Sequence, residues 1–367
     1  MKKFVMSFCA VFVLAACLLV TGCKAPSSSG AGETVQGGVQ QLPGGQQSGV
    51  ITKNNVADYI KNMTQSGTVK VTGEIDSNTI AAVKSALLYL KVNKPEVKVG
   101  LDLGETAGLT EIPQDAFYNY KNSCINLESI VIPDSVTGIG SDAFNGCTAL
   151  EKVNIPAGVE IIGAEAFNNC TGIKEVTIPE GVEYIDIDAF GGLISLKEVV
   201  IPDSLIGLYP EAFDSCTSLE KVTLKGSFDF GGAGGNPFSH CTSLKTFTLE
   251  GDSKFKVEDG VLYEDCPDRK YLMCYPAGKT DESFTIPSGV IIWDEAFSGA
   301  KYLKSVTIPI DATLAVCIFA DCTALEEIIF NGTKEEILGL CWDYPGQSMG
   351  NPKTDFVKCS DGNVPIR

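Results

Sequence analysis

The side chains with the most capacity for chemistry in this 367-residue chain are fourteen cysteines and one histidine, His240. A nucleophile needs an adjacent base, and zinc needs several nitrogen or sulfur ligands at close spacing. The sequence contains no CxxC, no HExxH, no Gly-x-Ser-x-Gly and no inward-facing pair of carboxylates. We therefore predict no catalytic residues, no metal site and no cofactor, and we expect a protein that is not an enzyme.

One cysteine, Cys23, stands at the end of an export leader. Lys2 and Lys3 form a positive start, and residues 4–20 are apolar or small, which is typical of a secretory signal peptide. The leader ends in a motif that looks like a bacterial lipobox, whose cysteine receives diacylglycerol: Leu19-Val20-Thr21-Gly22-Cys23. We predict a lipoprotein signal peptide over 1–22 and lipidation of Cys23. An ordinary signal peptide or a membrane anchor is the alternative.

Residues 23–50 follow as a stretch rich in Gly, Ser and Gln with almost no charge. Such a composition predicts a flexible tether with a reach of roughly 25–30 Å. Together with the lipid, the tether would hold a folded body off a bilayer. We therefore expect the protein at the bacterial outer membrane or cell surface, attached to the membrane through its N-terminal lipid.

The folded body is organised around an acid-Ala-Phe triplet that recurs every 23 residues, at Asp142-Ala143-Phe144, Glu165-Ala166-Phe167, Asp188-Ala189-Phe190 and Glu211-Ala212-Phe213. Each triplet leads to an aliphatic residue and then to a strand-like run, such as Val153-Asn154-Ile155-Pro156 or Val176-Thr177-Ile178-Pro179. A short fixed period predicts a solenoid, in which each unit buries its apolar side against its neighbours. We expect parallel strands, with the phenylalanines stacked along the axis in the core.

These motifs resemble the BspA-like (treponemal-type) leucine-rich repeat surface proteins, whose pattern combines Leu, a strand, Ile-Pro, Ile-Gly, Ala-Phe and Cys. Gly138-Ile139-Gly140 and Ile161-Ile162-Gly163 supply the Ile-Gly step. The resemblance implies a leucine-rich repeat solenoid with a parallel β-sheet on its concave face over 106–330. It also implies a hairpin insertion at 252–283 and a C-terminal cap over 331–367. Residues 51–105 combine helical and strand patterns and predict a small α/β N-terminal cap whose last strand begins the repeat sheet; a small independent domain is the alternative.

Most of the remaining cysteines follow the repeat. Cys147 and Cys170 occupy the same position in consecutive units, as do Cys216 and Cys241. Two interpretations remain open, either buried thiols that act as small apolar residues or disulfides. We favour buried thiols inside the repeats. A disulfide fits better outside them, for instance between Cys341 and Cys359.

The outward positions of the strands form the candidate ligand face, because a solenoid commonly binds partners there. These positions are Lys152, Asn154, Glu175, Thr177, Glu198, Val200, Lys221, Thr223, Thr246, Thr248, Ser305 and Thr307. Pairing of Glu151 with Lys174 and of Lys152 with Glu175 would make the same face a merely solvated surface. Aromatic side chains lie instead on the opposite side, at Tyr184, Tyr209 and Trp293, as a contact surface or as edge packing.

The net charge of −18 argues against nucleic acid as a partner, because phosphate binding needs rows of Lys and Arg. From the leader and the repeat surface we expect a lipid-anchored surface protein that binds a protein ligand and acts as a monomer. The resemblance implies adhesion to a host extracellular-matrix protein or to other cells. The alternative is a structural scaffold of the cell envelope that binds another bacterial protein.

Overall fold

The computed structural model describes residues 50–120, 123–230, 235–340, 349–350 and 352–366. They belong to one compact unit, Val50–Arg367. The predicted signal peptide, Cys23 and nearly all of the tether lie outside the described residues and stay predictions. Within the described part of the chain, no helix is long and apolar enough to cross a membrane.

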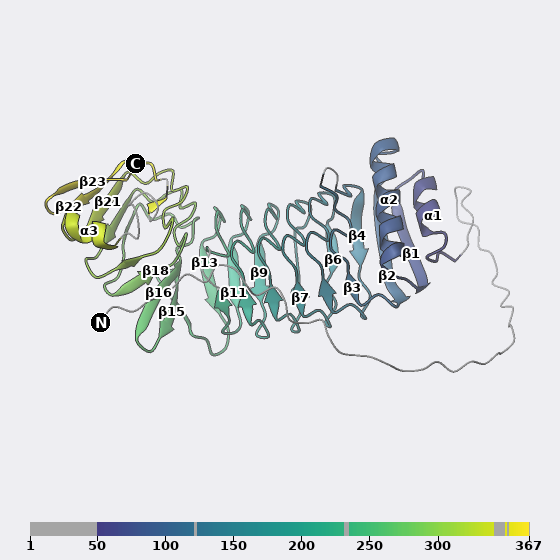
Figure 1. Cartoon of the computed structure of the whole chain (residues 1–367), viewed down its shortest axis with the longest axis horizontal. Coiled ribbons are helices and arrows are strands. Elements are labelled where there is room, and N and C mark those ends of the chain that lie inside the picture. Colours follow the sequence, from purple (N-terminus) through teal and green to yellow (C-terminus); the bar gives the residue numbers. More distant parts are fainter. Residues whose placement is uncertain (1–49, 121–122, 231–234, 341–348, 351, 367) are drawn as a thin grey trace. The chain divides into compact units, whose positions relative to one another are not determined.

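The unit begins with two helices and two strands, α1 (Val56–Asn62), β1 (Gly67–Glu74), α2 (Ser77–Asn93) and β2 (Val99–Ala107). Asp76 caps α2, since its carboxylate accepts a hydrogen bond from the Thr79 backbone N–H at 2.9 Å. The helix buries Ile80, Val83, Leu87 and Leu90. These residues lie on one side of the helix, and that side packs α2 against the first strands (Figure 1).

The first repeats continue the sheet of this cap. Four parallel strands pair in the order β1-β2-β4-β6, where β4 is Leu127–Val131 and β6 is Lys152–Asn154. Because β2 pairs directly with β4, the cap and the repeats share one sheet and one hydrophobic core. The predicted fold class, a leucine-rich repeat solenoid with an α/β N-terminal cap, is confirmed.

A second parallel sheet is built from strands of only two residues each. Its members, in spatial order, are β3 (Glu111–Ile112), β5 (Gly138–Ile139), β7 (Ile161–Ile162), β8 (Tyr184–Ile185), β10 (Gly207–Leu208) and β12 (Asp229–Phe230). Two of them, β5 and β7, contain the Ile of the Ile-Gly step of the repeats. We call the outer side of this sheet the short-strand face.

The outer side of the longer strands is the ladder face. After β6 it continues in β9 (Glu198–Ile201), β11 (Lys221–Leu224) and β13 (Thr246–Leu249), and then in β17 (Ser283–Thr285), β19 (Ser305–Ile308) and β21 (Glu327–Phe330). The strand expected at 176–178 does not form, so the ladder opens between β6 and β9. Val176-Thr177-Ile178 has a strong strand preference, but pairing also requires a neighbour at ladder distance.

The segment expected to hold a hairpin contains three antiparallel strands, β14 (Phe255–Glu258), β15 (Val261–Cys266) and β16 (Arg269–Cys274). The repeats resume from β16, which pairs in parallel with β18 (Val290–Ile292), itself followed by β20 (Thr313–Leu314). Tyr275, directly after the hairpin, takes the place of a repeat phenylalanine. Its ring stacks on Phe297 with centroids 5.1 Å apart.

The chain ends with α3 (Lys334–Leu340), β22 (Phe356–Cys359) and β23 (Gly362–Pro365). Strand β22 pairs in parallel with β21, and β23 folds back on β22 in antiparallel direction. This end covers apolar surface that the last repeat would otherwise expose, since Ile337, Val357 and Val364 join the C-terminal hydrophobic core.

The core is organised by the predicted aromatic column. Phe117, Phe144, Phe167, Phe190, Phe213 and Phe238 stack in order, with neighbouring centroids 5.0 to 5.7 Å apart and planes within 16° of parallel. Each ring is fully or almost fully buried. The expected stacking is therefore confirmed, and these residues belong to the core.

Replacing one ring of the column tests its contribution. Phe167→Ala removes a ring that stacks on two neighbours, and we expect the free energy of unfolding to fall by about 3–5 kcal/mol. Phe356→Ala, at a half-exposed ring of β22, is the matched control and should cost much less. Urea unfolding of both variants measures the difference; equal losses would contradict a stability that depends on the column.

Candidate functional site

The predicted ligand face is divided among separate sheets. Glu198, Lys221 and Thr246 form one cross-strand row of the sheet β9-β11-β13, and Val200, Thr223 and Thr248 form the next. Lys152 and Asn154 lie on β6, Ser305 and Thr307 on β19, and Glu175 and Thr177 in the opening between β6 and β9. The structure therefore brings only half of the predicted residues together in one sheet.

Not all of these positions are accessible. Most of the predicted side chains are exposed or half-exposed, but Thr223 is buried, with 6% of its surface exposed. Its cross-strand partners Val200 and Thr248 flank it on both sides. Thr223 therefore has little surface to offer a ligand, unlike the other predicted positions.

Ion pairs between rungs neutralise much of the ladder face. The Lys174 ammonium lies 3.7 Å from the Glu151 carboxylate, as predicted, and Lys245 and Lys304 lie 2.7 Å from Glu220 and Glu282. The expected pair of Lys152 with Glu175 does not appear among the ion pairs of the described residues. Exposed pairs of this kind contribute little to stability. They do leave the ladder face with balanced charge.

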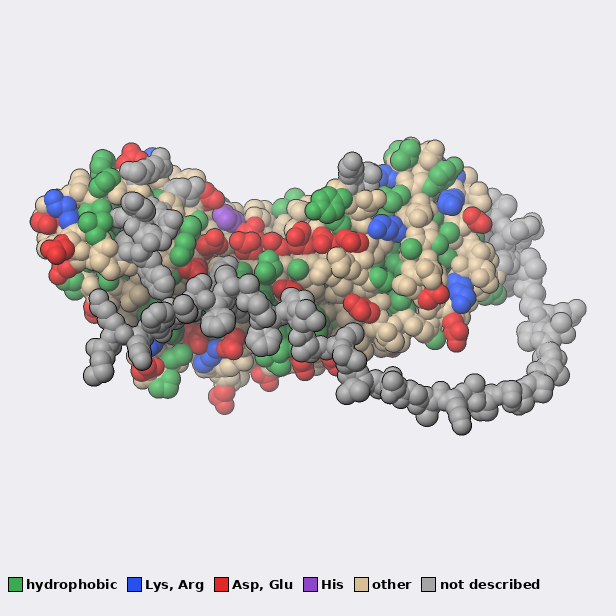
Figure 2. Space-filling view, viewed as in Figure 1, with side chains coloured by type: hydrophobic (Ala, Val, Ile, Leu, Met, Phe, Trp, Pro, Cys, Tyr) green, Lys and Arg blue, Asp and Glu red, His purple; other side chains and the backbone are tan. Residues whose placement is uncertain are grey.

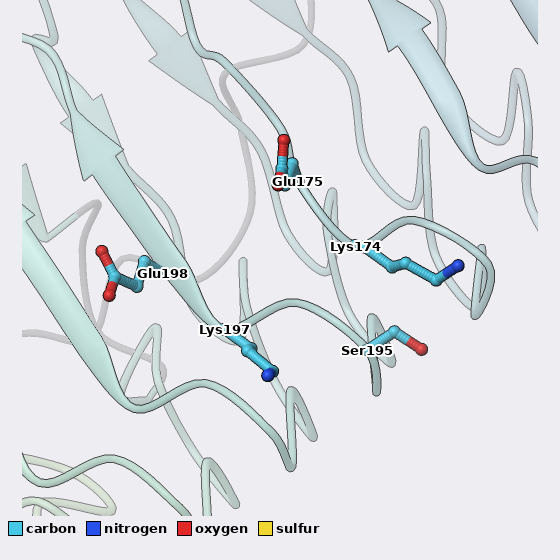
Figure 3. A pocket seen from close by; sticks show the side chains of 5 residues that line it. All are labelled: Lys174, Glu175, Ser195, Lys197 and Glu198. Carbon is cyan, nitrogen blue, oxygen red and sulfur yellow. The ribbon is translucent and has the colours of Figure 1, made fainter.

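The opening of the ladder forms a shallow depression of about 510 Å³. Lys174, Glu175, Ser195, Lys197 and Glu198 line it (Figure 3). In that view Ser195 and the two lysines extend away from the two glutamates. The Ser195 hydroxyl donates to the Thr171 carbonyl at 2.8 Å. The depression therefore offers separate positive and negative edges, suited to a polar segment of a partner protein.

The repeat cysteines are buried thiols, as the favoured interpretation held. Each of Cys170, Cys216 and Cys241 donates to the carbonyl of a phenylalanine in the preceding rung, at 3.0 to 3.2 Å. Burial raises the pKa of the Cys170 thiol to about 12, so it stays protonated and unreactive at neutral pH. None of the ten cysteines in the described residues is bonded to another of them. Cys341 lies outside those residues, so its pairing with Cys359 stays a prediction.

The acids of the triplets all adopt a left-handed backbone, with φ between 54° and 59°: Asp115, Asp142, Glu165, Asp188, Glu211 and Glu295. Because this conformation recurs at one position per rung, the carboxylates line up along the repeats as a continuous row (Figure 2). Burial, with nearby Glu211, raises the pKa of Asp188 to about 6. Burial and Glu295 likewise raise the pKa of Glu211.

His240 lies next to this row and joins two distant repeats. Its Nδ1 is 2.7 Å from the Asp214 carboxylate, and its Nε2 is 2.9 Å from that of Asp321. The residue has a left-handed backbone with φ of 56°, at a position where other rungs carry Gly146 or Gly192. The hydrogen bond that the His240 ring donates to the Asp214 carboxylate raises the pKa of His240 to about 9, despite opposing burial. At neutral pH the ring is therefore an imidazolium clamped between two carboxylates.

The surroundings of His240 resemble a catalytic triad, since the Ser298 hydroxyl lies 3.2 Å from Nε2 and Asp214 contacts Nδ1. A general base must accept a proton near neutral pH, and a ring with a pKa of about 9 is already protonated. Ser298 is also only 2% exposed. The geometry therefore supports a clamp between rungs. Sequence reasoning missed it because Asp214, His240 and Asp321 are far apart in the chain.

The three aromatic residues away from the ladder face have different surroundings. Trp293 packs against both hydrophobic cores, and its ring meets Tyr271 edge-on at 6.0 Å, so it serves as edge packing. Tyr184 and Tyr209 are half-exposed on or beside the short-strand face. Their rings lie on the two sides of Gly207, where an added Cβ would be 3.2 Å from each.

A family model described as BspA type leucine rich repeat region, in six copies, matches residues 110–245, 160–267 and 277–344. Together these ranges cover more than half of the chain. No significant match was found among curated proteins.

Solved structures with similarity to the chain include a leucine rich cell surface protein from Faecalibacterium prausnitzii A2-165. It is 29% identical over 60% of this chain and 70% of that one, with a TM-score of 0.43. A leucine-rich repeat protein from Bacteroides ovatus is 24% identical over 60% and 59%, with a TM-score of 0.43. The T. pallidum leucine-rich repeat protein is 28% identical over 42% and 72%, with a TM-score of 0.36.

The clamp at His240 predicts a pH-dependent stability. A raised histidine pKa stabilises the fold fully below the unfolded value of 6.5, and this contribution is lost as the pH rises through about 9. Buried cysteines also reduce stability above about pH 8.5, because their thiols ionise only in the unfolded chain. The difference in the free energy of unfolding between wild type and His240→Gln isolates the contribution of the imidazole. We expect this difference to shrink from pH 6.5 to 9 in urea unfolding; a constant difference would contradict the clamp.

Proposed function

Because the chain belongs to the BspA-type leucine-rich repeat family, we propose that it is a protein-binding module, held at the bacterial cell surface by a lipid on Cys23 and acting in adhesion. The observation that carries the proposal is the open repeat surface. Its ladder face presents rows of polar side chains, and its depression between β6 and β9 has charged edges of both signs.

A binding role suits this geometry better than catalysis. Substrates of enzymes are commonly held in enclosed clefts, whereas the depression on the ladder face is shallow and open to solvent. The triad-like group at His240 has a protonated base and a buried hydroxyl. Protein partners, in contrast, are recognised over broad surfaces with a few anchoring side chains. We therefore propose that the chain is not an enzyme.

The lipid anchor is supported by the sequence before the compact unit. The apolar leader ends at Cys23 in the lipobox-like Leu19-Val20-Thr21-Gly22, and the Gly, Ser and Gln tether follows. One lipid chain binds a membrane only weakly, so a diacylglycerol-modified cysteine is a stronger anchor than a single acyl group. This arrangement would display residues 50–367 at the end of the tether.

Substituting Cys23 tests the anchor. Cys23→Ser removes the thiol that would carry the lipid, and we expect the protein to leave the membrane fraction and to incorporate no radiolabelled palmitate. The matched control is Cys17→Ser, which alters another cysteine of the leader and should leave both readouts unchanged. Continued labelling of Cys23→Ser would contradict the predicted lipidation of Cys23, because another residue would then carry the lipid.

Display and binding are tested together on intact cells. We expect external protease to remove the protein from intact cells, and immobilised residues 50–367 to capture defined extracellular-matrix proteins offered one at a time. A protein that stays protected on intact cells would argue against adhesion and would favour a scaffold inside the envelope. A surface-displayed unit that captures none of the proteins offered would argue against the proposed binding.

A further inference from the structure

The short-strand face carries an apolar strip at its centre. The outward positions of its strands pair in register along Glu111, Gly138, Ile161, Tyr184, Gly207 and Asp229. Ile161 is 49% exposed, and Ile206, beside Gly207, is 48% exposed. The rings of Tyr184 and Tyr209 both lie close to Gly207, each 3.2 Å from the position of an added Cβ, and they add half-exposed aromatic surface to the strip. Tyrosine is enriched among the residues that anchor protein partners.

A groove of about 290 Å³ adjoins this strip at Gly138. Glu111, Glu160 and Ile161 stand around it, with Thr110 and Thr137 beside them. The floor is open, because a Cβ added at Gly138 would meet only the Glu111 side chain, at 3.7 Å. The groove therefore has room for one apolar side chain of a partner, with carboxylates at its rim.

The charge around the strip has one sign. Ten acidic residues and no Lys or Arg occur in five segments that contain these strands and the turns after them, 110–117, 137–146, 160–169, 183–192 and 206–215. In the described part of the chain, no ion pair involves Glu111, Glu160 or Glu183. The ladder face, with its lysine partners, differs sharply in this respect.

We propose that the short-strand face binds a basic polypeptide segment in which Lys or Arg side chains flank an apolar one. The apolar side chain enters the Gly138 groove, next to Ile161 and its cross-strand neighbour Tyr184, and the cations meet Glu111, Glu160 and Glu183. Phosphate-bearing partners are disfavoured, because these carboxylates repel them. This inference rests on the proposed protein-binding function and assigns it a surface and a class of partner.

A defined pair of probes tests the charge requirement. The probes are a short peptide of alternating Lys and Val and a twin of alternating Glu and Val, offered to the compact unit 50–367. We expect binding of the Lys–Val peptide that weakens with added salt, and no binding of the twin. Equal affinity for the two peptides would overturn the proposal.

Variants locate the binding surface. Gly138→Leu fills the groove without a strained backbone, and Tyr184→Ala removes the aromatic surface beside Ile161; each should weaken binding of the Lys–Val peptide about tenfold or more. Glu160→Gln should weaken it and reduce the salt dependence. The matched control is Thr313→Leu, which adds the same side chain at an exposed position of β20, in another sheet, and should leave affinity unchanged.

Thermal unfolding of every variant ensures that only folded proteins are compared. Unchanged affinity in folded Gly138→Leu and Tyr184→Ala, or an equal loss in Thr313→Leu, would overturn the assignment of the surface. Capture of an extracellular-matrix protein that persists in Gly138→Leu would also overturn it while leaving the proposed binding function intact. Failure of the wild-type unit to capture any protein would instead count against that function itself.

Discussion

Every rung of the solenoid depends on the contact between its aromatic ring and the rings of the neighbouring rungs. A single rung has too few apolar residues to exclude water from its own phenylalanine, so the ring becomes buried only when the next rung stacks on it. The same stacking of rungs places the cysteine thiols within hydrogen-bonding distance of phenylalanine carbonyls in the preceding rung. At the hairpin insertion, Tyr275 keeps an aromatic ring in place against Phe297.

The stack also explains why charged residues tolerate a costly backbone. A left-handed conformation costs a residue other than glycine roughly 1–2 kcal/mol, yet Glu165, Glu211 and Glu295 all adopt it. The turn they form places the following Ala and Phe in the core, so the burial of the ring offsets the strain. The resulting row of carboxylates is thus a consequence of core packing. The row places a line of negative charge beside the short-strand face.

The fold could be predicted because its determinants are local and repeated. The 23-residue step fixes which residues face inward, and this is enough to place the aromatic column, the buried thiols and the cap strand. Contacts between distant segments could not be predicted in the same way. The opening at Val176–Ile178 and the clamp of His240 on Asp321 depend on how rungs meet in space, and no periodic pattern encodes them.

At the candidate site too, the sequence pattern predicted some features and missed others that depend on contacts in three dimensions. Alternation identified exposed or half-exposed positions, apart from buried Thr223, but exposure alone does not make a binding surface. On the ladder face, lysines of one rung satisfy glutamates of the next, as Lys174 does for Glu151. On the short-strand face, Glu160 and Glu183 have no lysine partner among the residues that the structure describes, and they border exposed Ile161 and half-exposed Tyr184. A partner gains most where the protein has left charge and apolar surface unsatisfied, which favours the short-strand face.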